Sequence, residues 1–85
     1  MRVLVPSALV SYTGTSTIEA AGDSLLAMLA DMDARFPGIR FRIADEQQQL
    51  RPNLRIFVNG QGVRDLSHPL QPSDGVAIVL ALSGG

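Results

Sequence analysis

A single apolar stripe with helical spacing lies in the first half of the sequence and limits the folds open to it. Apolar residues recur there at intervals of four, three and four, which is the spacing of one side of a helix. The stripe consists of Leu25, Leu29, Met32 and Phe36, and Leu26 and Met28 widen it. With 85 residues the chain has room for one domain and one core, so this helix must pack against whatever the rest forms.

The residues on either side of the stripe set the ends of the predicted helix. Asp23 follows Gly22 and is a good N-cap, because its carboxylate can accept hydrogen bonds from the first free backbone N–H groups. Pro37 disfavours helical geometry in Phe36 and ends the helix there. A leucine and methionine stripe of this kind is typical of a hydrophobic core and not of a cofactor site.

Short segments rich in β-branched residues flank the helix and predict strands. They are residues 2–6, 15–20, 54–58 and 76–82, with a short return through Val63 after the hairpin signal "NGQG" at 59–62. Between the helix and the third strand, Phe41 and Ile43 alternate with arginines and predict a short edge strand. The following "DEQQQ" is expected to form a solvated loop or a helical turn.

This order of elements predicts an α+β fold, a four- or five-stranded mixed sheet with one main helix across one face. The first two strands are expected to form a hairpin with a long connection. Because side chains alternate along a strand, Ile56 points to the helix side and Phe57 to the other. No second helix is predicted to cover that other face, so Phe57 and Val79 are candidates for an exposed apolar patch, which marks a partner site.

The side chains that carry enzyme chemistry are scarce. Cysteine is absent, which excludes disulfides, thiolate metal sites and cysteine nucleophiles. The one histidine, His68, precedes Pro69 and is expected to be a loop residue. The Asp45–Glu46 pair has nothing nearby to bury it and raise a carboxyl pKa, so acid–base catalysis is not expected. Together these features argue against a stand-alone enzyme.

The charge pattern narrows the range of partners. Seven basic and eight acidic residues give a net charge of −1 and no basic stripe, so we expect no binding to nucleic acid. No apolar run approaches a membrane span and no signal-peptide pattern is present, so we expect a soluble, cytoplasmic protein. All seven basic residues are arginine, so copies of the protein cannot be linked through side-chain amines.

The last three residues, Ser83, Gly84 and Gly85, are predicted to form a flexible tail beyond a domain that spans residues 1–82. Without Cβ atoms, glycines can enter a channel too narrow for side chains, and three extended residues reach roughly 10 Å. The tail would present an α-carboxylate with a pKa of about 3.3–3.7, ionised at neutral pH. Because a carboxylate resists nucleophiles, another enzyme has to activate it, for example as an acyl-adenylate formed from ATP.

Three segments follow one another in the second half of the chain: "RIFVNG" at 55–60, "VRDL" at 63–66 and "SHPLQPSDGVAIVLALSGG" at 67–85. Taken in this order, they resemble the MoaD/ThiS family of small sulfur carriers, which have the β-grasp, or ubiquitin-like, fold. The first half, from "VPSALVSYTG" to "FPGIRFRIAD", is more similar to the carriers of cysteine biosynthesis and related thiocarboxylate pathways. Two turns depart from the family pattern, with Gly14-Thr15 in place of two glycines and Ser73-Asp74-Gly75 before the last strand.

The resemblance implies a mechanism and two partners. A ubiquitin-activating-type enzyme would adenylate Gly85 with ATP and Mg²⁺, and a sulfur donor would displace AMP to leave a thiocarboxylate. An acceptor enzyme, cysteine-synthase-like or similar to the large subunit of molybdopterin synthase, would then receive the sulfide. The carrier itself would bind no cofactor or metal. Gly84 matches the family motif directly, whereas Phe57, Val79 and Leu82 match docking residues only by position.

Two other functions stay open at this point. The chain is also compatible with a ubiquitin-like modifier, joined through Gly85 to amines of other proteins. It is equally compatible with a non-covalent β-grasp binding module whose final glycines play no part.

Overall fold

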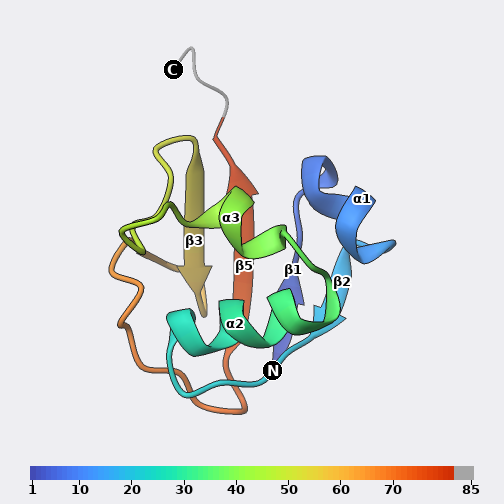
Figure 1. Cartoon of the computed structure of the whole chain (residues 1–85). Helices are drawn as coiled ribbons and strands as arrows, with labels where there is room; N and C mark the ends of the chain where they lie inside the picture. The colour runs from blue at the N-terminus through green and yellow to red at the C-terminus, as the bar shows by residue number, and fades with distance from the viewer. Residues whose placement is uncertain (82–85) are drawn as a thin grey trace.

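The computed structural model describes residues 1–81, which form a five-stranded mixed sheet with helices on one face (Figure 1). The sheet order is β2-β1-β5-β3-β4. The strands are β1 (Arg2–Leu4), β2 (Thr17–Glu19), β3 (Leu54–Val58), β4 (Gln61–Val63) and β5 (Gly75–Leu80). The helical segments are η1 (Ser7–Leu9), α1 (Val10–Thr13), α2 (Leu25–Arg35) and α3 (Ile39–Ile43). The predicted α+β class and sheet are confirmed.

The central strand β5 runs parallel to its neighbour β1, and the other neighbours in the sheet are antiparallel. A parallel pair needs a long crossover, which the chain between them supplies, and α2 packs across the sheet within that crossover (Figure 1). The strand residues that face α2 are almost fully buried: Val3 is 0% exposed, Ile56 1% and Ile78 2%. The core therefore lies between one face of the sheet and the helices.

The main helix matches its predicted span, but its N-cap is Ser24 and not Asp23. The Ser24 side chain accepts a hydrogen bond from the Ala27 N–H at 3.1 Å. Asp23 instead uses its backbone carbonyl, which accepts from the Leu70 N–H at 3.0 Å and ties the helix start to the loop before β5. The prediction was wrong by one residue because either side chain can cap a helix and only the loop contact decides between them.

Gly22 is required at the entry to α2 because the chain passes very close to the helix there. Its φ is +148°, a conformation that side-chain-bearing residues rarely adopt. A Cβ built on Gly22 would lie 2.5 Å from the Met28 backbone nitrogen, well inside van der Waals contact. A glycine is therefore the only residue that fits this crossing without moving the backbone.

The predicted edge strand around Phe41 and Ile43 is wrong, because residues 39–43 form the short helix α3. Ile39 and Ile43 are four residues apart and both are 0% exposed, so helical geometry buries both where a strand would bury Phe41 with them. The Asp33 carboxylate of α2 accepts from the Gly38 and Arg40 N–H groups at 3.1 Å and starts the new helix. An alternating run this short does not distinguish the two structures.

The predicted first hairpin with a long connection is confirmed, since β1 and β2 pair antiparallel and the connection between them contains η1 and α1. Asn59 and Gly60 have φ values of 52° and 83°, as a tight hairpin turn between β3 and β4 requires. The Asp45 carboxylate accepts from the Gln47 and Gln49 N–H groups and closes the solvated loop. His68 lies in the loop between β4 and β5, as expected.

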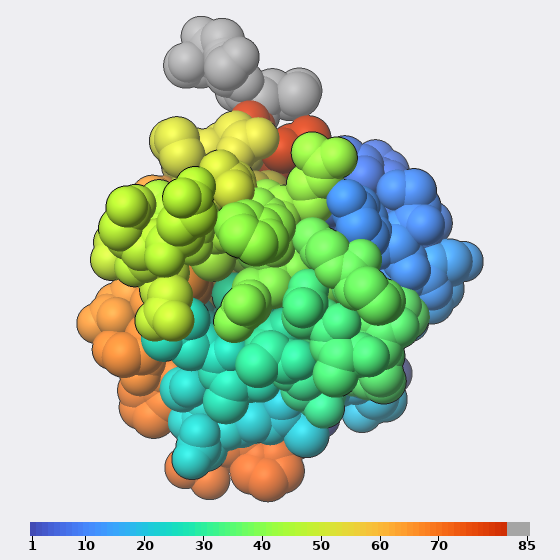
Figure 2. Space-filling model, viewed as in Figure 1, coloured from blue at the N-terminus to red at the C-terminus, as the bar shows by residue number. Residues whose placement is uncertain are grey.

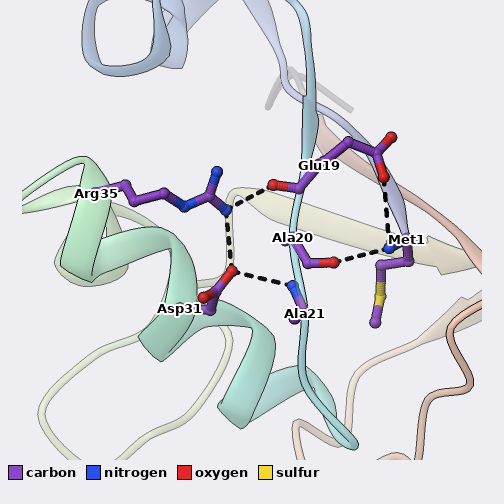
Figure 3. A network of polar contacts seen from close by, with 6 residues as sticks. All are labelled: Met1, Glu19, Ala20, Ala21, Asp31 and Arg35. Atoms are coloured by element: carbon purple, nitrogen blue, oxygen red, sulfur yellow. Dashed lines mark hydrogen bonds and ion pairs between the residues drawn. The ribbon is translucent and has the colours of Figure 1, made fainter.

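A polar network fastens α2 to the edge of the sheet at β2 (Figure 3). The Asp31 carboxylate accepts from the Ala21 N–H at 3.0 Å and from Arg35 Nη2 at 2.9 Å. These two contacts, chiefly the bond from Ala21, hold the pKa of Asp31 below its usual value. Arg35 also donates to the Glu19 carbonyl, and the Glu19 carboxylate lies 3.6 Å from the Met1 amino group.

Candidate docking face and tail root

The face of the sheet turned away from α2 carries a row of apolar side chains, which we call the open face. Ala77 of β5 is opposite Leu4 of β1 and Phe57 of β3, so these three residues form one line across three strands. Val79 lies two residues further along β5 and therefore on the same side. Leu4 is 47% exposed and Val79 42% exposed, whereas Phe57 is half-buried.

Leu4, Ala77 and Phe57 line a shallow depression of about 450 Å³, and Arg2 and Asn59 also line it. The structure thus brings together the predicted partner residues Phe57 and Val79 on one exposed apolar face. Leu4 was not predicted to belong to it. The signal was present in the sequence, since Leu4 alternates with the buried Val3 and Val5 and must point the other way.

The tail root is the end of β5, the central strand of the sheet. Leu80 pairs with Leu54 in the last register position of the strand. The Ala81 N–H donates to the Asn53 carbonyl at 2.8 Å, so the sheet holds the backbone as far as Ala81. The other predicted site residues, Leu82, Ser83, Gly84 and Gly85, lie outside the described residues, and their roles stay predictions.

The start of β5 is held by the turn that departs from the family pattern. The Asp74 carboxylate accepts from the Gln71 N–H at 2.8 Å and from Asn59 Nδ2 at 2.9 Å. These bonds, the one from Gln71 first, lower the pKa of Asp74. The Gly75 N–H donates back to Asn59 Oδ1 at 2.9 Å, so Ser73-Asp74-Gly75 forms a closed turn against the β3–β4 hairpin.

The turn at Gly14-Thr15, where many family members have two glycines, forms with one glycine because it needs only one residue in the left-handed conformation. Gly14 ends α1 with a φ of +76°, and its N–H donates to the Val10 carbonyl. Thr15, which stands where many family members have a second glycine, has no positive φ. The local geometry therefore requires only the glycine that this chain retains.

Two features of the described part of the chain concern metal binding and membrane spanning. Across residues 1–81, no three histidine, cysteine or acidic side chains are grouped so that they could hold a metal ion. None of the helices in this range has the length and apolarity to cross a membrane. What the structure presents is an apolar open face and a strand end beside it.

The fold and this site define the class of protein, a ubiquitin-like β-grasp domain, and solved structures agree. The chain matches a chain in the crystal structure of the Amycolatopsis orientalis BexX/CysO complex with a TM-score of 0.90 and 30% identity, covering 99% of this chain and 98% of that one. It matches small archaeal modifier protein 1 from Methanosarcina acetivorans with a TM-score of 0.79 and 25% identity, covering 99% and 94%.

Sequence comparison gives the family. The model described as "ThiS family" matches residues 3–85, and the chain therefore belongs to the ThiS family. It is also 33% identical over 91 residues to the sulfur carrier protein CysO of Mycobacterium tuberculosis, covering 100% of this chain and 98% of that protein. The chain is thus a sulfur carrier of the CysO/ThiS type, and its relatives are small carrier proteins.

Proposed function

We propose that this protein carries sulfur as a thiocarboxylate on Gly85. The carboxylate would attack the α-phosphate of ATP, with Mg²⁺ on the partner enzyme, to give an acyl-adenylate and pyrophosphate. Hydrosulfide would then attack the acyl carbon and expel AMP to leave the thiocarboxylate. Alternatively, a persulfide would attack and expel AMP to give an acyl disulfide, which a thiol would reduce to the thiocarboxylate. The family match carries this proposal, because it extends through Gly84 and Gly85 and a carrier needs one activatable group.

The geometry of the described residues supports the carrier role in two ways. The backbone is hydrogen-bonded up to Ala81, so Gly85 is only four residues beyond a fixed point of the sheet. The open face lies on the same strand as this root, with Val79 two residues before Ala81. A partner that binds the open face through Leu4, Phe57 and Val79 is therefore placed to receive the tail.

We further propose that the acceptor acts in cysteine biosynthesis or in the formation of a sulfur-containing specialised metabolite. The similarity to a CysO sulfur carrier over the whole chain supports this choice. The Amycolatopsis orientalis complex, in which CysO is assembled with BexX, supports a protein partner for such a carrier. The acceptor would take the sulfur, and water would release the carrier with its carboxylate restored.

Intact-mass measurement tests the proposal directly. The carrier is incubated with a ubiquitin-activating-type enzyme, ATP, Mg²⁺ and sulfide, and we expect a mass gain equal to the exchange of one oxygen for sulfur. A variant that lacks Gly84 and Gly85 should fold normally and gain nothing. An unchanged mass of the full chain with every enzyme of this type would contradict the proposal.

A modifier function is the second candidate, and the likeness to small archaeal modifier protein 1 favours it. In that case the activated Gly85 forms amide bonds with lysines of other proteins. Adding a lysine-rich acceptor protein to the same reaction distinguishes the two functions. A carrier accumulates the thiocarboxylate, whereas a modifier produces heavier conjugates that disappear when Gly85 is deleted.

A further inference from the structure

A groove of about 800 Å³ lies beside the tail root, on the helical side of the sheet, and no step of the proposed chemistry uses it. Its walls come from α1, from α3 and from the facing ends of β3 and β5. The residues that matter here are Tyr12, Phe41, Arg42, Arg51, Asn53 and Leu80, and we call this site the arginine groove. Figure 1 shows α1 and α3 toward the end of the sheet where β5 stops.

Two arginines give the groove its charge, and each is held in place by a hydrogen bond to a neutral group. Arg42 Nε donates to the Tyr12 hydroxyl at 2.7 Å, a bond that raises the pKa of Arg42. Arg51 Nε donates to the Phe41 carbonyl at 2.6 Å. Both bonds use the Nε atom. The terminal nitrogens of the two guanidinium groups have no hydrogen-bond partner among residues 1–81.

No acidic side chain lines the arginine groove to balance these charges. Within the described part of the chain the ion pairs are Met1–Glu19 and Arg35–Asp31, which belong to the network in Figure 3. Arg42 and Arg51 take part in neither. The groove is thus a concave site with two preoriented positive charges and no anion from residues 1–81.

The remaining lining indicates a protein ligand and not a small anion. Phe41 is 55% exposed, the largest exposure of any large apolar side chain described, and it stands at the groove with Leu80. A guanidinium group pairs with a carboxylate through two parallel hydrogen bonds, and a neighbouring aromatic ring adds apolar contact. An aspartate or glutamate beside an apolar residue on a partner surface matches both features.

The position of the groove identifies the partner. Gly85 is the fifth residue after Leu80, and five residues span at most about 18 Å. An enzyme whose active site encloses Gly85 must therefore come within that distance of Leu80, which is itself part of the groove wall. Under the proposed function, both the adenylating enzyme and the acceptor enclose Gly85 in every cycle. The open face offers an apolar contact for the acceptor, so we assign the arginine groove to the adenylating enzyme.

We propose that the arginine groove docks an acidic segment of the adenylating enzyme, with Arg42 and Arg51 pairing to its carboxylates and Phe41 to an adjacent apolar side chain. This inference rests on the proposed function and adds a recognition site to it. Complementary charge at such a contact steers association, so its effect should decrease as salt is added.

Adenylation kinetics test the inference with a matched pair of variants. Arg42→Gln with Arg51→Gln removes two charges from the groove, whereas Arg40→Gln with Arg64→Gln removes two charges elsewhere. Folding of each is checked by thermal unfolding and by the backbone amide NMR spectrum. We expect the groove variant to raise the KM for the carrier about tenfold at low salt without changing kcat, and the other variant to change neither.

Two further outcomes keep the inference distinct from the proposed function. Arg42→Lys with Arg51→Lys should bring the KM only part of the way back to the parent value, because the charge is kept but the two parallel hydrogen bonds to a carboxylate are lost. A groove variant that folds and shows the same KM as the Arg40 and Arg64 variant overturns the docking site while the carrier function stands. Failure of the unmodified chain to be adenylated by any such enzyme overturns the proposed function, and the docking site with it.

An NMR titration identifies the ligand class without any enzyme. The probes are a six-residue peptide of alternating aspartate and glutamate, blocked at both ends, and inorganic phosphate. Saturable shifts at the amides of Tyr12, Phe41 and Arg42 with the peptide alone are expected. Equal shifts with phosphate would assign a small-anion site, and no groove shift with the peptide would exclude an acidic ligand; either result overturns the inference.

Discussion

The two faces of the sheet are formed by the same strands, but their side chains differ in exposure to solvent. In β5, Ile78 is 2% exposed against α2 and the next residue, Val79, is 42% exposed on the open face. In β3, Ile56 is 1% exposed and Phe57 is half-buried. Figure 2 views the helical side and shows its strands covered by helices and loops.

This difference shows that neighbouring residues of one strand have different roles in this protein. One side chain stabilises the fold, and the next is exposed and can contact a partner. Apolar side chains on the covered face are removed from water and stabilise the fold. Similar side chains on the open face gain little from folding and remain available to a partner. Stability and partner binding should therefore be separable by substitutions one residue apart.

The largest effect is expected on the covered face. Ile78→Ala should lower the free energy of unfolding by about 2–5 kcal/mol, because it removes buried methyl groups and leaves a cavity. The same change at Val79 should cost about 1 kcal/mol or less, since that side chain already faces water. Urea unfolding of the two variants measures both values. Equal costs would contradict the contrast between the faces.

A smaller effect is expected at the start of the helix that covers the sheet. Ser24→Ala removes the hydrogen bond to the Ala27 N–H and should cost about 0.5–2 kcal/mol. Asp23→Ala keeps both that bond and the Asp23 backbone carbonyl and serves as the control. Thermal unfolding compares the stability of the two variants. A greater loss of stability in the Asp23 variant would show that Asp23, and not Ser24, caps the helix.

The open face should respond in function more than in stability. Leu4→Thr combined with Val79→Thr removes apolar surface and should change the unfolding free energy by only about 1 kcal/mol or less. Transfer of sulfur from the loaded carrier to its acceptor should fall severalfold, because exposed apolar residues supply the contact. The control is Ala34→Ser, which changes an exposed residue of α2 and should leave sulfur transfer unchanged. An equal loss of transfer in both variants would show that the open face does not bind the acceptor.

The smallest effect concerns the network that joins α2 to β2. The pKa of Asp31 is lowered in the folded state, so its stabilising contribution is present above its unfolded value of about 3.9. That contribution is lost as the pH falls through the lower folded value. Asp31→Asn should therefore be less stable than the parent at neutral pH, and the gap should close in acid.

Unfolding measured against pH provides the test for Asp31, with Glu46→Gln as the control for removing one surface charge. A gap that stays constant from neutral pH into acid would show that the carboxylate contributes nothing through its charge.

Much of this protein could be predicted from local patterns. The spacing of Leu25, Leu29 and Met32 predicted α2, the "NGQG" signal predicted the hairpin, and the alternation along 54–58 and 76–80 placed Phe57 and Val79 on the open face. These predictions hold because periods of 3.6 and 2 residues follow from backbone geometry alone. The segment 67–85 with its two glycines also indicated the family, because its residues are contiguous in the sequence and can be compared without knowledge of the fold.

Tertiary contacts decided the rest. Residues 39–43 became a helix because the Asp33 carboxylate starts it and because the core takes both Ile39 and Ile43. Ser24 became the cap because Asp23 is tied through its backbone to Leu70. The arginine groove joins Tyr12, Arg42 and Arg51, which are far apart in the chain, and no local period relates them. Only packing brings such residues together, since their interactions depend on distance in space and not on spacing in sequence.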